Sequence, residues 1–377
     1  MVNAYPTHAQ RIRQELYVQS SWVYAWQRPL RPSMSRTGTT GRLGAGAVRR
    51  ILAAMLLAVV LYGGFAIWRG LSTMKGELTR FHWWTFGAAC GLAMGNYLLR
   101  WLKWEFYLAR LEIRGIGRQD SLLTFLSGFV LTVTPGKVGE VFKSVLLFDL
   151  HGIPVARTAP IVVAERVTDV IGIVALIVIG STGLSGGLMW AAIGSAVVAA
   201  LLWVVSQRRL SLGLIEAVQR SPGPFKRLGP RLTEAYESLA TTIRPSNLAI
   251  PAFLSLCAWT LECAALWVVL RGLDQATSFG LSTFFYATST LAGALVPVPG
   301  GLGVTETALQ GQMQELGHVP PAASTAAMIL VRFATLWFAV LVGFASLSLL
   351  RRKHPELLTA REPEDSSVTP SGRHGSV

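Results

Sequence analysis

Charged side chains lie within several apolar stretches of this sequence, at spacings that suit the binding of an ionic group. Glu165 and Asp169 are four residues apart, so a helix places both carboxylates on one face. Two ionised carboxylates in an apolar environment require cations nearby. The candidate partners are Lys137, Lys143, Arg166 and Arg332.

Two Pro-Gly motifs offer a second kind of chemistry, because Pro and paired Gly break helices. One motif starts at Thr134 inside the apolar stretch 121–150, and the other starts at Pro297 inside 282–310. Either these residues only let two half-helices turn and pack, or they expose a helix N-terminus that attracts phosphate. In the second case Thr134 is the N-cap and Pro135 takes the first helical position. The second motif then forms the opposite end of the same phosphate site. The predicted turn residues are Pro135, Gly136, Gly139, Pro299, Gly300, Gly301 and Gly303.

Other polar residues in apolar stretches carry weaker signals. Asn96 and Arg100 are four residues apart, and Glu105 follows near the end of the same stretch. Arg100 is expected to extend its charge to the membrane surface. Glu262 stands alone, and is either a protonated packing residue or a member of the site.

Cysteine and histidine usage gives no metal site. Cys90, Cys257 and Cys263 lie in apolar runs without a CxxC motif or a nearby histidine, and the six histidines are scattered. There is no HExxH, and no GxSxG placed on a membrane helix. We therefore expect no metal, no cofactor and no catalytic residue.

Composition places the chain in a membrane. It is 51% hydrophobic and 14% charged, whereas soluble domains carry about 25% charged residues. The net charge is +14, and the Lys and Arg residues flank the apolar runs. That distribution is typical of positive-inside topology and of anionic head groups rather than of nucleic acid, so no nucleic-acid partner is expected.

The apolar runs predict an all-α, polytopic membrane helix bundle with six full spans and two re-entrant helical hairpins, about eight hydrophobic segments in all. The hairpins are 121–150 and 282–310, whose broken backbone is tolerable only where protein or water satisfies it. An aromatic belt is expected around the second span. The predicted spans are 51–68, 83–104, 160–180, 187–205, 248–270 and 320–350; the belt residues are Trp83, Trp84, Trp101 and Trp104.

The remaining segments divide the chain. Residues 1–48 are expected to be a disordered basic tail, with translation starting at Met1 or Met34, and 354–377 a disordered C-terminal tail. Residues 49–353 form the transmembrane domain. Within 206–247, the apolar face running from Leu232 to Ile243 belongs either to an interfacial helix or to a loop helix packed on the bundle.

Loop charges set the orientation. The basic segments 103–120, in which Lys103 is counted, and 206–247 are predicted to be cytoplasmic, as are both termini, whereas 69–82 and 181–186 lie outside. We expect a multi-pass protein of the cell inner (plasma) membrane.

The order of spans and hairpins, with the sides assigned from the loop charges, predicts an inverted repeat. Repeat one is 83–180 and repeat two is 248–350; each has a Pro-Gly motif followed by an acidic residue and, some thirty residues later, an arginine. The first hairpin enters from the cytoplasm and the second from outside. Transporters place their substrate site between such repeats, near the midplane. The acidic residues are Glu140 and Glu306, and the arginines are Arg166 and Arg332.

Three roles for the intramembrane charges stay open. A charge at the bilayer centre costs about 2.5–3.5 kcal/mol on insertion scales, so such residues are paired or functional. They form a buried ion network that locks the repeats together, or they recognise a lipid phosphate or cationic head group, or one carboxylate carries protons.

Four motifs in order resemble the flippase-like transmembrane domain of the lysyl-phosphatidylglycerol synthase family. They are Leu131–Lys143 (LTVTPGKVGEVFK), Glu165–Asp169 (ERVTD), Pro297–Glu306 (PVPGGLGVTE) and Arg332. The resemblance covers residues 50–350. It implies translocation of aminoacylated phosphatidylglycerol or, in stand-alone relatives, of polyprenyl-linked or other glycolipids of the cell envelope. Lys143 stands where relatives more often carry Arg, which keeps the charge but loses a bidentate phosphate contact.

The chain ends soon after its last span, so a stand-alone member without the synthase domain is expected. The predicted function is translocation of an anionic or aminoacylated phospholipid or polyprenyl-linked glycolipid between leaflets. The alternatives are a membrane-embedded glycosyl or aminoacyl transferase and an accessory subunit of an envelope-synthesis complex. Expected partners are membrane lipids, with a homo-oligomer or envelope-synthesis enzymes as protein partners. The predicted head-group site is Lys137, Glu140, Lys143, Glu165, Arg166, Asp169, Glu306 and Arg332.

Overall fold

The computed structural model describes residues 74–134, 140–182, 229–296 and 298–357, with a few isolated positions between 189 and 196. All of them belong to one compact unit, Gly44–Val377. Every regular element in this part of the chain is a helix, as the sequence predicts. The expected span 51–68, nearly all of 187–205, the basic tail and residues 358–377 lie outside the described residues.

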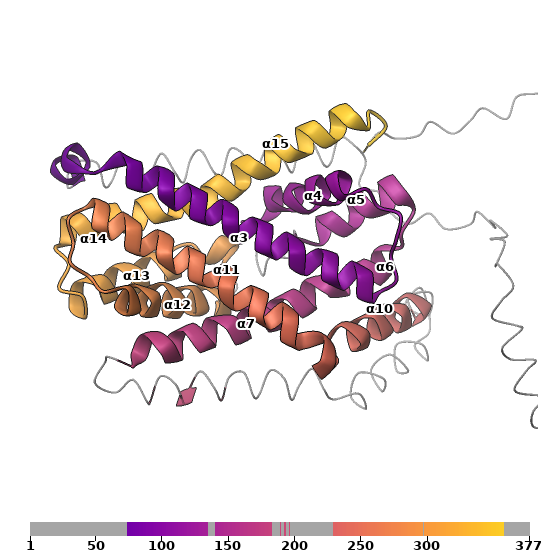
Figure 1. The fold of residues 1–377 in the computed structure, drawn as a ribbon, viewed down its shortest axis with the longest axis horizontal. Coiled ribbons are helices and arrows are strands. Elements are labelled where there is room, and N and C mark those ends of the chain that lie inside the picture. Colours follow the sequence, from indigo (N-terminus) through magenta and orange to yellow (C-terminus); the bar gives the residue numbers. More distant parts are fainter. Residues whose placement is uncertain are drawn as a thin grey trace, which may run out of the picture. The chain divides into compact units, whose positions relative to one another are not determined.

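Two long helices run side by side through the bundle (Figure 1). They are α3, Trp83–Arg110, and α11, Pro245–Gly272. Helix α11 begins with proline, whose fixed φ suits the first helical position. The next helix to pack on α11 is α7, Pro160–Ser181, which also starts with proline.

Glycines let these helices approach closely. A Cβ added to Gly172 of α7 would lie 2.9 Å from the backbone nitrogen of Leu256 in α11. One added to Gly180 would lie 2.8 Å from the carbonyl oxygen of Gly280. Small residues at helix contacts are typical of membrane bundles, where packing replaces the hydrophobic effect between helices.

The first predicted hairpin contains a helix on each side of its break. Helix α4, Arg118–Ser127, continues into the 3₁₀ turn η1, Gly128–Leu131, and the chain resumes helical structure in α5, Phe142–His151. Residues 135–139 lie outside the described part, so the predicted N-cap role of Thr134 stays a prediction. Helix α4 packs against α15, Phe338–Lys353.

The second hairpin has the same helix, break and helix order. Its helices are α12, Phe279–Leu295, and α13, Val304–Glu315, with the short turn η4, Pro299–Gly301, between them. Gly301 has a φ of +67°, and a Cβ there would lie 2.8 Å from the Thr305 hydroxyl. The predicted turn therefore requires glycine at this position for both conformation and space.

The last helical segment has a π-helical turn in its middle. Helix α14, Pro321–Arg332, passes through η5, Phe333–Trp337, into α15, Phe338–Lys353. Such turns free a backbone carbonyl and occur often at functional sites.

Two of the described helical segments are long and apolar enough to cross a membrane, Ser246–Gly272 and Pro321–Lys353. Helices α3 and α7 have 28 and 22 residues, which at 1.5 Å per residue gives about 42 and 33 Å, enough for a core of about 30 Å. The number of spans and the re-entrant character of the hairpins stay predictions. Helix α10, Gly229–Thr242, packs on α7 and on the short helix α6, Val155–Thr158, as a loop helix on the bundle would.

Candidate functional site

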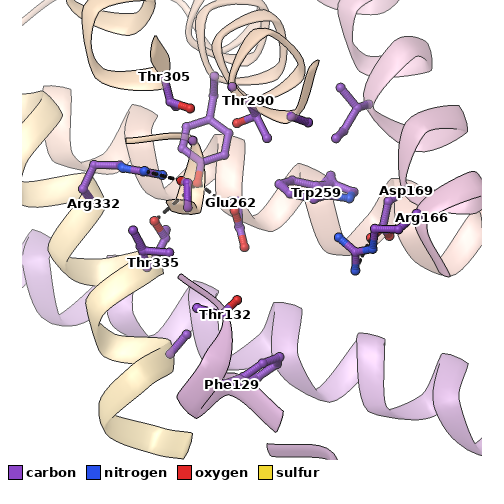
Figure 2. Close-up of a pocket in the computed structure, with 18 of the residues that line it drawn as sticks. Phe129, Thr132, Arg166, Asp169, Trp259, Glu262, Thr290, Thr305, Arg332 and Thr335 are labelled. Carbon is purple, nitrogen blue, oxygen red and sulfur yellow. Dashed lines mark hydrogen bonds and ion pairs between the residues drawn. The ribbon is translucent and has the colours of Figure 1, made fainter. Parts of the chain in front are cut away.

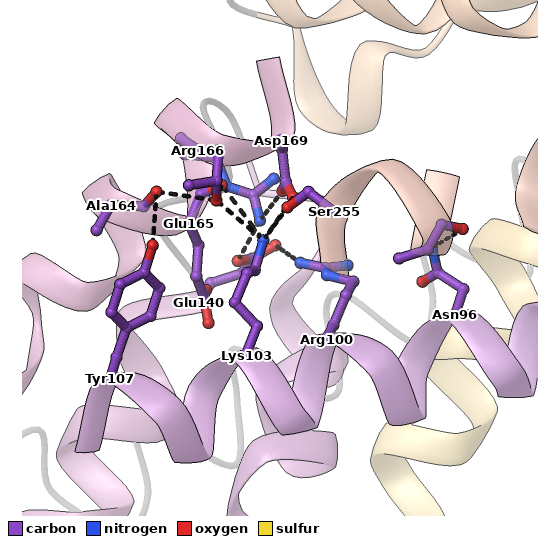
Figure 3. Close-up of polar contacts among 12 residues, drawn as sticks. Asn96, Arg100, Lys103, Tyr107, Glu140, Ala164, Glu165, Arg166, Asp169 and Ser255 are labelled. Atoms are coloured by element: carbon purple, nitrogen blue, oxygen red, sulfur yellow. Dashed lines mark hydrogen bonds and ion pairs between the residues drawn. The ribbon is translucent and has the colours of Figure 1, made fainter. Parts of the chain in front are cut away.

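A polar stripe follows one face of α3. Asn96, Arg100, Lys103 and Tyr107 recur at intervals of three and four residues, which places them on one side of the helix. All four are buried. Figure 3 shows them pointing together toward α7 and α11.

Lys103 was expected in a cytoplasmic loop, and that expectation is wrong. Its side chain is fully buried within α3, and its Nζ lies 2.6 Å from Asp169 Oδ1 and 2.8 Å from Ser255 Oγ. Ser255 in turn donates to Asp169 Oδ1 at 2.9 Å. A lysine at this depth is stable because its charge is matched by a carboxylate and its donors are used.

Glu140, just after the first break, accepts from two arginines. Arg100 Nη2 lies 3.3 Å from its Oε1, and Arg166 Nη2 lies 3.1 Å from its Oε2. Arg166 also forms an ion pair with Asp169 at 3.0 Å. The predicted carboxylate face of α7 is thus joined to α3 and to the first hairpin (Figure 3).

The charge of Lys143 is held by a carboxylate and by aromatic rings. Its Nζ donates to Glu165 Oε2 at 2.6 Å and lies 4.5 Å from the centroid of the Trp104 ring. Trp104 is fully buried beneath it, so its expected place in an aromatic belt is wrong. It forms a cation–π contact instead, whereas Trp83 and Trp84 are exposed as a belt requires.

Lys103 Nζ also lies 3.5 Å from the carbonyl oxygen of Glu165, which joins the Lys143–Glu165 pair to the others. Together these contacts define one charged cluster, built from four cations and three carboxylates. Its members are Arg100, Lys103, Glu140, Lys143, Glu165, Arg166 and Asp169.

The second hairpin has a smaller ionic group. Arg332 Nε donates to Glu306 Oε1 at 2.6 Å, and its Nη2 donates to the carbonyl oxygen of Gly300 at 3.0 Å. The other oxygen of Glu306 accepts from the backbone nitrogen of Gly303 at 2.6 Å. Arg332 and Glu306 therefore fix the glycine turn and the start of α13.

A cavity of about 310 Å³ lies between the charged cluster and this second group. Arg100, Arg166 and Arg332 line it from three different helices. The carboxylates of Asp169 and Glu262 line it as well, and Figure 2 shows them with Arg166 and Arg332. Both hairpins contribute, through Phe129 and Thr132 of the first and the break and helices of the second. The second hairpin's lining residues include Tyr286, Thr290, Gly293, Val296, Gly300, Gly301 and Thr305.

The predicted site residues fall into four groups. Arg166, Asp169, Arg332 and the turn residues Gly300 and Gly301 line the cavity. A second group is buried behind the wall and holds the arginines or the helices in place: Glu140, Lys143, Glu165 and Glu306. Pro299 and Gly303 belong to the second break; Lys137, Pro135, Gly136 and Gly139 lie outside the described residues.

Sequence reasoning missed or undervalued several cavity residues. Arg100, expected to reach the membrane surface, is buried and lines the cavity. Glu262 also lines the cavity and accepts a hydrogen bond from Tyr286 at 2.7 Å. Tyr97 also lines it and donates to the Thr335 carbonyl in η5 at 2.6 Å. The available signal was the polar stripe of α3, whose spacing continues through Lys103 rather than ending at Arg100.

Known proteins resemble this chain over most of its length. A UPF0104 membrane protein of Methanothermobacter thermautotrophicus is 23% identical over 315 residues, covering 76% of this chain and 90% of that protein. A second, from Methanocaldococcus jannaschii, is 21% identical over 271 residues, covering 67% of this chain and 80% of that protein. The glycosyltransferase AglD of Haloferax volcanii is 24% identical over 343 residues, covering 81% of this chain and 53% of AglD.

Residues 47–343 match the family described as the lysylphosphatidylglycerol synthase TM region, and this range contains both hairpins, the charged cluster and the cavity. The family and the two membrane-protein relatives place the chain in a membrane as an integral protein. The chain belongs to the family of the lysylphosphatidylglycerol synthase transmembrane region.

Proposed function

We propose that this protein translocates an anionic or aminoacylated phospholipid, or a polyprenyl-linked glycolipid, between the leaflets of its membrane. One observation carries the proposal: Arg100, Arg166 and Arg332, from three helices, line a single cavity to which described residues of both hairpins contribute. A guanidinium group binds phosphate oxygens through paired donors and stays charged in an apolar environment. Three such groups suit a lipid phosphate.

The size and the rim of the cavity support a head-group site. About 310 Å³ is at the lower end of small-ligand cavities, so it suits a head group without its acyl chains. Val296 lines the cavity and is 40% exposed, and the neighbouring Leu295 is 67% exposed. Acyl chains would lie along this apolar edge, in the bilayer, while the head group passes through.

Two equivalent ion pairs support the inverted repeat. Glu140 and Arg166 are paired and lie 26 residues apart; Glu306 and Arg332 are paired and also lie 26 residues apart. Each pair ties the residue after a break to a following helix. With hairpins entering from opposite sides, as the loop charges indicate, alternate opening around the cavity would expose it to each leaflet in turn.

A lipid-linked transferase is the second candidate, because AglD bears the name glycosyltransferase. The match covers 53% of AglD, so the activity in that name can reside in the part of AglD outside it. The same reconstituted protein distinguishes the candidates: a transferase changes the chemical identity of its lipid, whereas a translocase changes only the leaflet.

The test is reconstitution in vesicles that carry a fluorescent lipid in one leaflet, with phosphatidylglycerol, its lysyl ester and polyprenyl-phosphate sugars as the panel. The proposal predicts loss of leaflet asymmetry for at least one lipid, relative to vesicles without protein. The measurement is repeated with an imposed pH gradient and membrane potential. Preserved asymmetry for the whole panel under all conditions would rule translocation out.

A further inference from the structure

Glu262 faces the same cavity as the three arginines, and this arrangement constrains the ligand. The residue lies in the middle of α11, is buried, and lines the cavity with Trp259 one helical turn before it. Tyr286 of the second hairpin donates to Glu262 Oε2 at 2.7 Å and so orients the carboxylate. In the view of Figure 2, Glu262 lies between Arg332 and Trp259.

Phosphate binding by the three arginines does not itself require a carboxylate at position 262. An ionised carboxylate at Glu262 would repel a phosphate bound in a cavity of about 310 Å³, because like charges at close range in a low dielectric disfavour each other. A carboxylate becomes favourable when the ligand also carries a hydrogen-bond donor, because charge-assisted hydrogen bonds are the strong ones. Repulsion of the wrong ligand is itself a source of specificity.

The rest of the cavity lining supports a ligand with donors close to its phosphate. Thr290, Thr305 and Thr335 line the cavity with hydroxyl groups that accept as well as donate. The Trp259 ring offers a face for an ammonium or for the carbon skeleton of a polyol. Together they surround the carboxylate with groups that suit a small polar substituent.

Resting on the proposed function, we infer that Glu262, oriented by Tyr286, selects lipids whose head group carries a hydroxyl or ammonium donor beside the phosphate, and rejects head groups that offer only phosphate. Glu262 and Tyr286 are then specificity-determining residues, whereas the arginines bind the phosphate that all candidate lipids share.

The experiment compares three lipids labelled on an acyl chain in reconstituted vesicles: phosphatidylglycerol with hydroxyl donors, phosphatidylethanolamine with an ammonium donor, and phosphatidic acid with phosphate only. Wild-type protein is expected to move phosphatidylglycerol or phosphatidylethanolamine faster than phosphatidic acid. The faster of the two shows whether the preferred donor is a hydroxyl or an ammonium group. In Glu262→Gln the preference over phosphatidic acid should fall about tenfold, since a hydrogen bond to a charged group is replaced and a repulsive charge is removed.

Two further variants separate specificity from folding. Tyr286→Phe keeps the ring and removes only the hydroxyl, so it should lower the same preference about threefold even if Glu262→Gln does not fold. Glu237→Gln, on the exposed face of α10, is the matched control and should leave the preference unchanged.

The outcomes distinguish this inference from the proposed function. If wild-type protein moves none of the three lipids or those of the earlier panel, the translocase proposal fails. If it moves them and folded Glu262→Gln and Tyr286→Phe keep the wild-type preference, or Glu237→Gln lowers it equally, translocation stands and the role of Glu262 is overturned.

Discussion

Lys103 illustrates at the scale of single residues what the sequence could and could not predict. The carboxylates of α7 and the arginines of both repeats were identified because charges in apolar runs are costly and must be paired. Lys103 was placed in a loop because it lies near the end of an apolar run, where hydropathy changes gradually. Its fully buried contact with Asp169 depends on the three-dimensional approach of α3 to α7 and α11, which no local pattern encodes.

We predict that Lys103→Met destabilises the protein strongly. The substitution leaves Asp169 buried without its closest cation, and breaking a buried pair typically costs about 3–5 kcal/mol. Thermal unfolding in detergent measures the effect. The double variant Lys103→Met, Asp169→Leu should regain much of the stability, because an apolar pair replaces the ionic one, yet it should not regain transport. A stable single variant would contradict the pairing.

Arg166→Lys separates charge from geometry. Lysine keeps the positive charge near Glu140 and Asp169 but loses the planar pair of donors, so we expect folded protein with translocation slowed about tenfold. The vesicle assay measures the rate, with Arg271→Lys at the end of α11 as control. Equal rates in both variants would show that Arg166 contributes only charge.

At the scale of elements, the helices on each side of the two predicted breaks were predictable and the π-helical turn was not. Proline and paired glycine predict a helix break because their effect on the backbone is local. Gly300 and Gly301 adopt the positive φ that only glycine takes easily. The turn η5 follows Arg332 in a run that is apolar except for Thr335. Its geometry is stabilised from outside that run, by the Tyr97 hydroxyl bound to the Thr335 carbonyl.

Packing of the first hairpin on α15 depends on Gly343. A Cβ there would lie 2.6 Å from the backbone nitrogen of Val130 and 3.0 Å from the carbonyl carbon of Phe129. Gly343→Ala should therefore cost about 1–3 kcal/mol, as overpacking does, and lower the unfolding temperature in detergent. Gly91→Ala in α3 is the control, because nothing lies within 4 Å of its added Cβ. Equal effects of the two substitutions would refute the close contact.

At the scale of the whole molecule, composition and loop charge predict a membrane bundle, and family membership agrees. The inverted repeat stays a prediction, which rests on the same order of motifs in the two halves of the chain. The cavity was not predictable, since it is lined by α3, α7, α11 and α14 together with the described parts of both hairpins, and residue spacing does not fix how separate helices pack.

Topology gives a prediction for the intact protein. The loop charges put the start of α11 inside and its end outside, so Glu237→Cys should react only from the cytoplasm and Ala276→Cys only from outside. Labelling with an impermeant maleimide in intact cells and in lysed cells measures this, in a background without native cysteines. Reaction of both positions from the same side would contradict the inverted arrangement. The native cysteines to replace are Cys90, Cys257 and Cys263.

The central claim is that a lipid phosphate occupies the cavity between the hairpins. The most direct measurement is an experimental structure of the protein in nanodiscs that contain phosphatidylglycerol. We predict phosphate density within hydrogen-bond distance of Arg166 and Arg332, with acyl chains leaving along Leu295 and Val296. Lipid phosphates found only at the two bilayer surfaces, with none in the cavity of the fully lipid-loaded protein, would contradict the account.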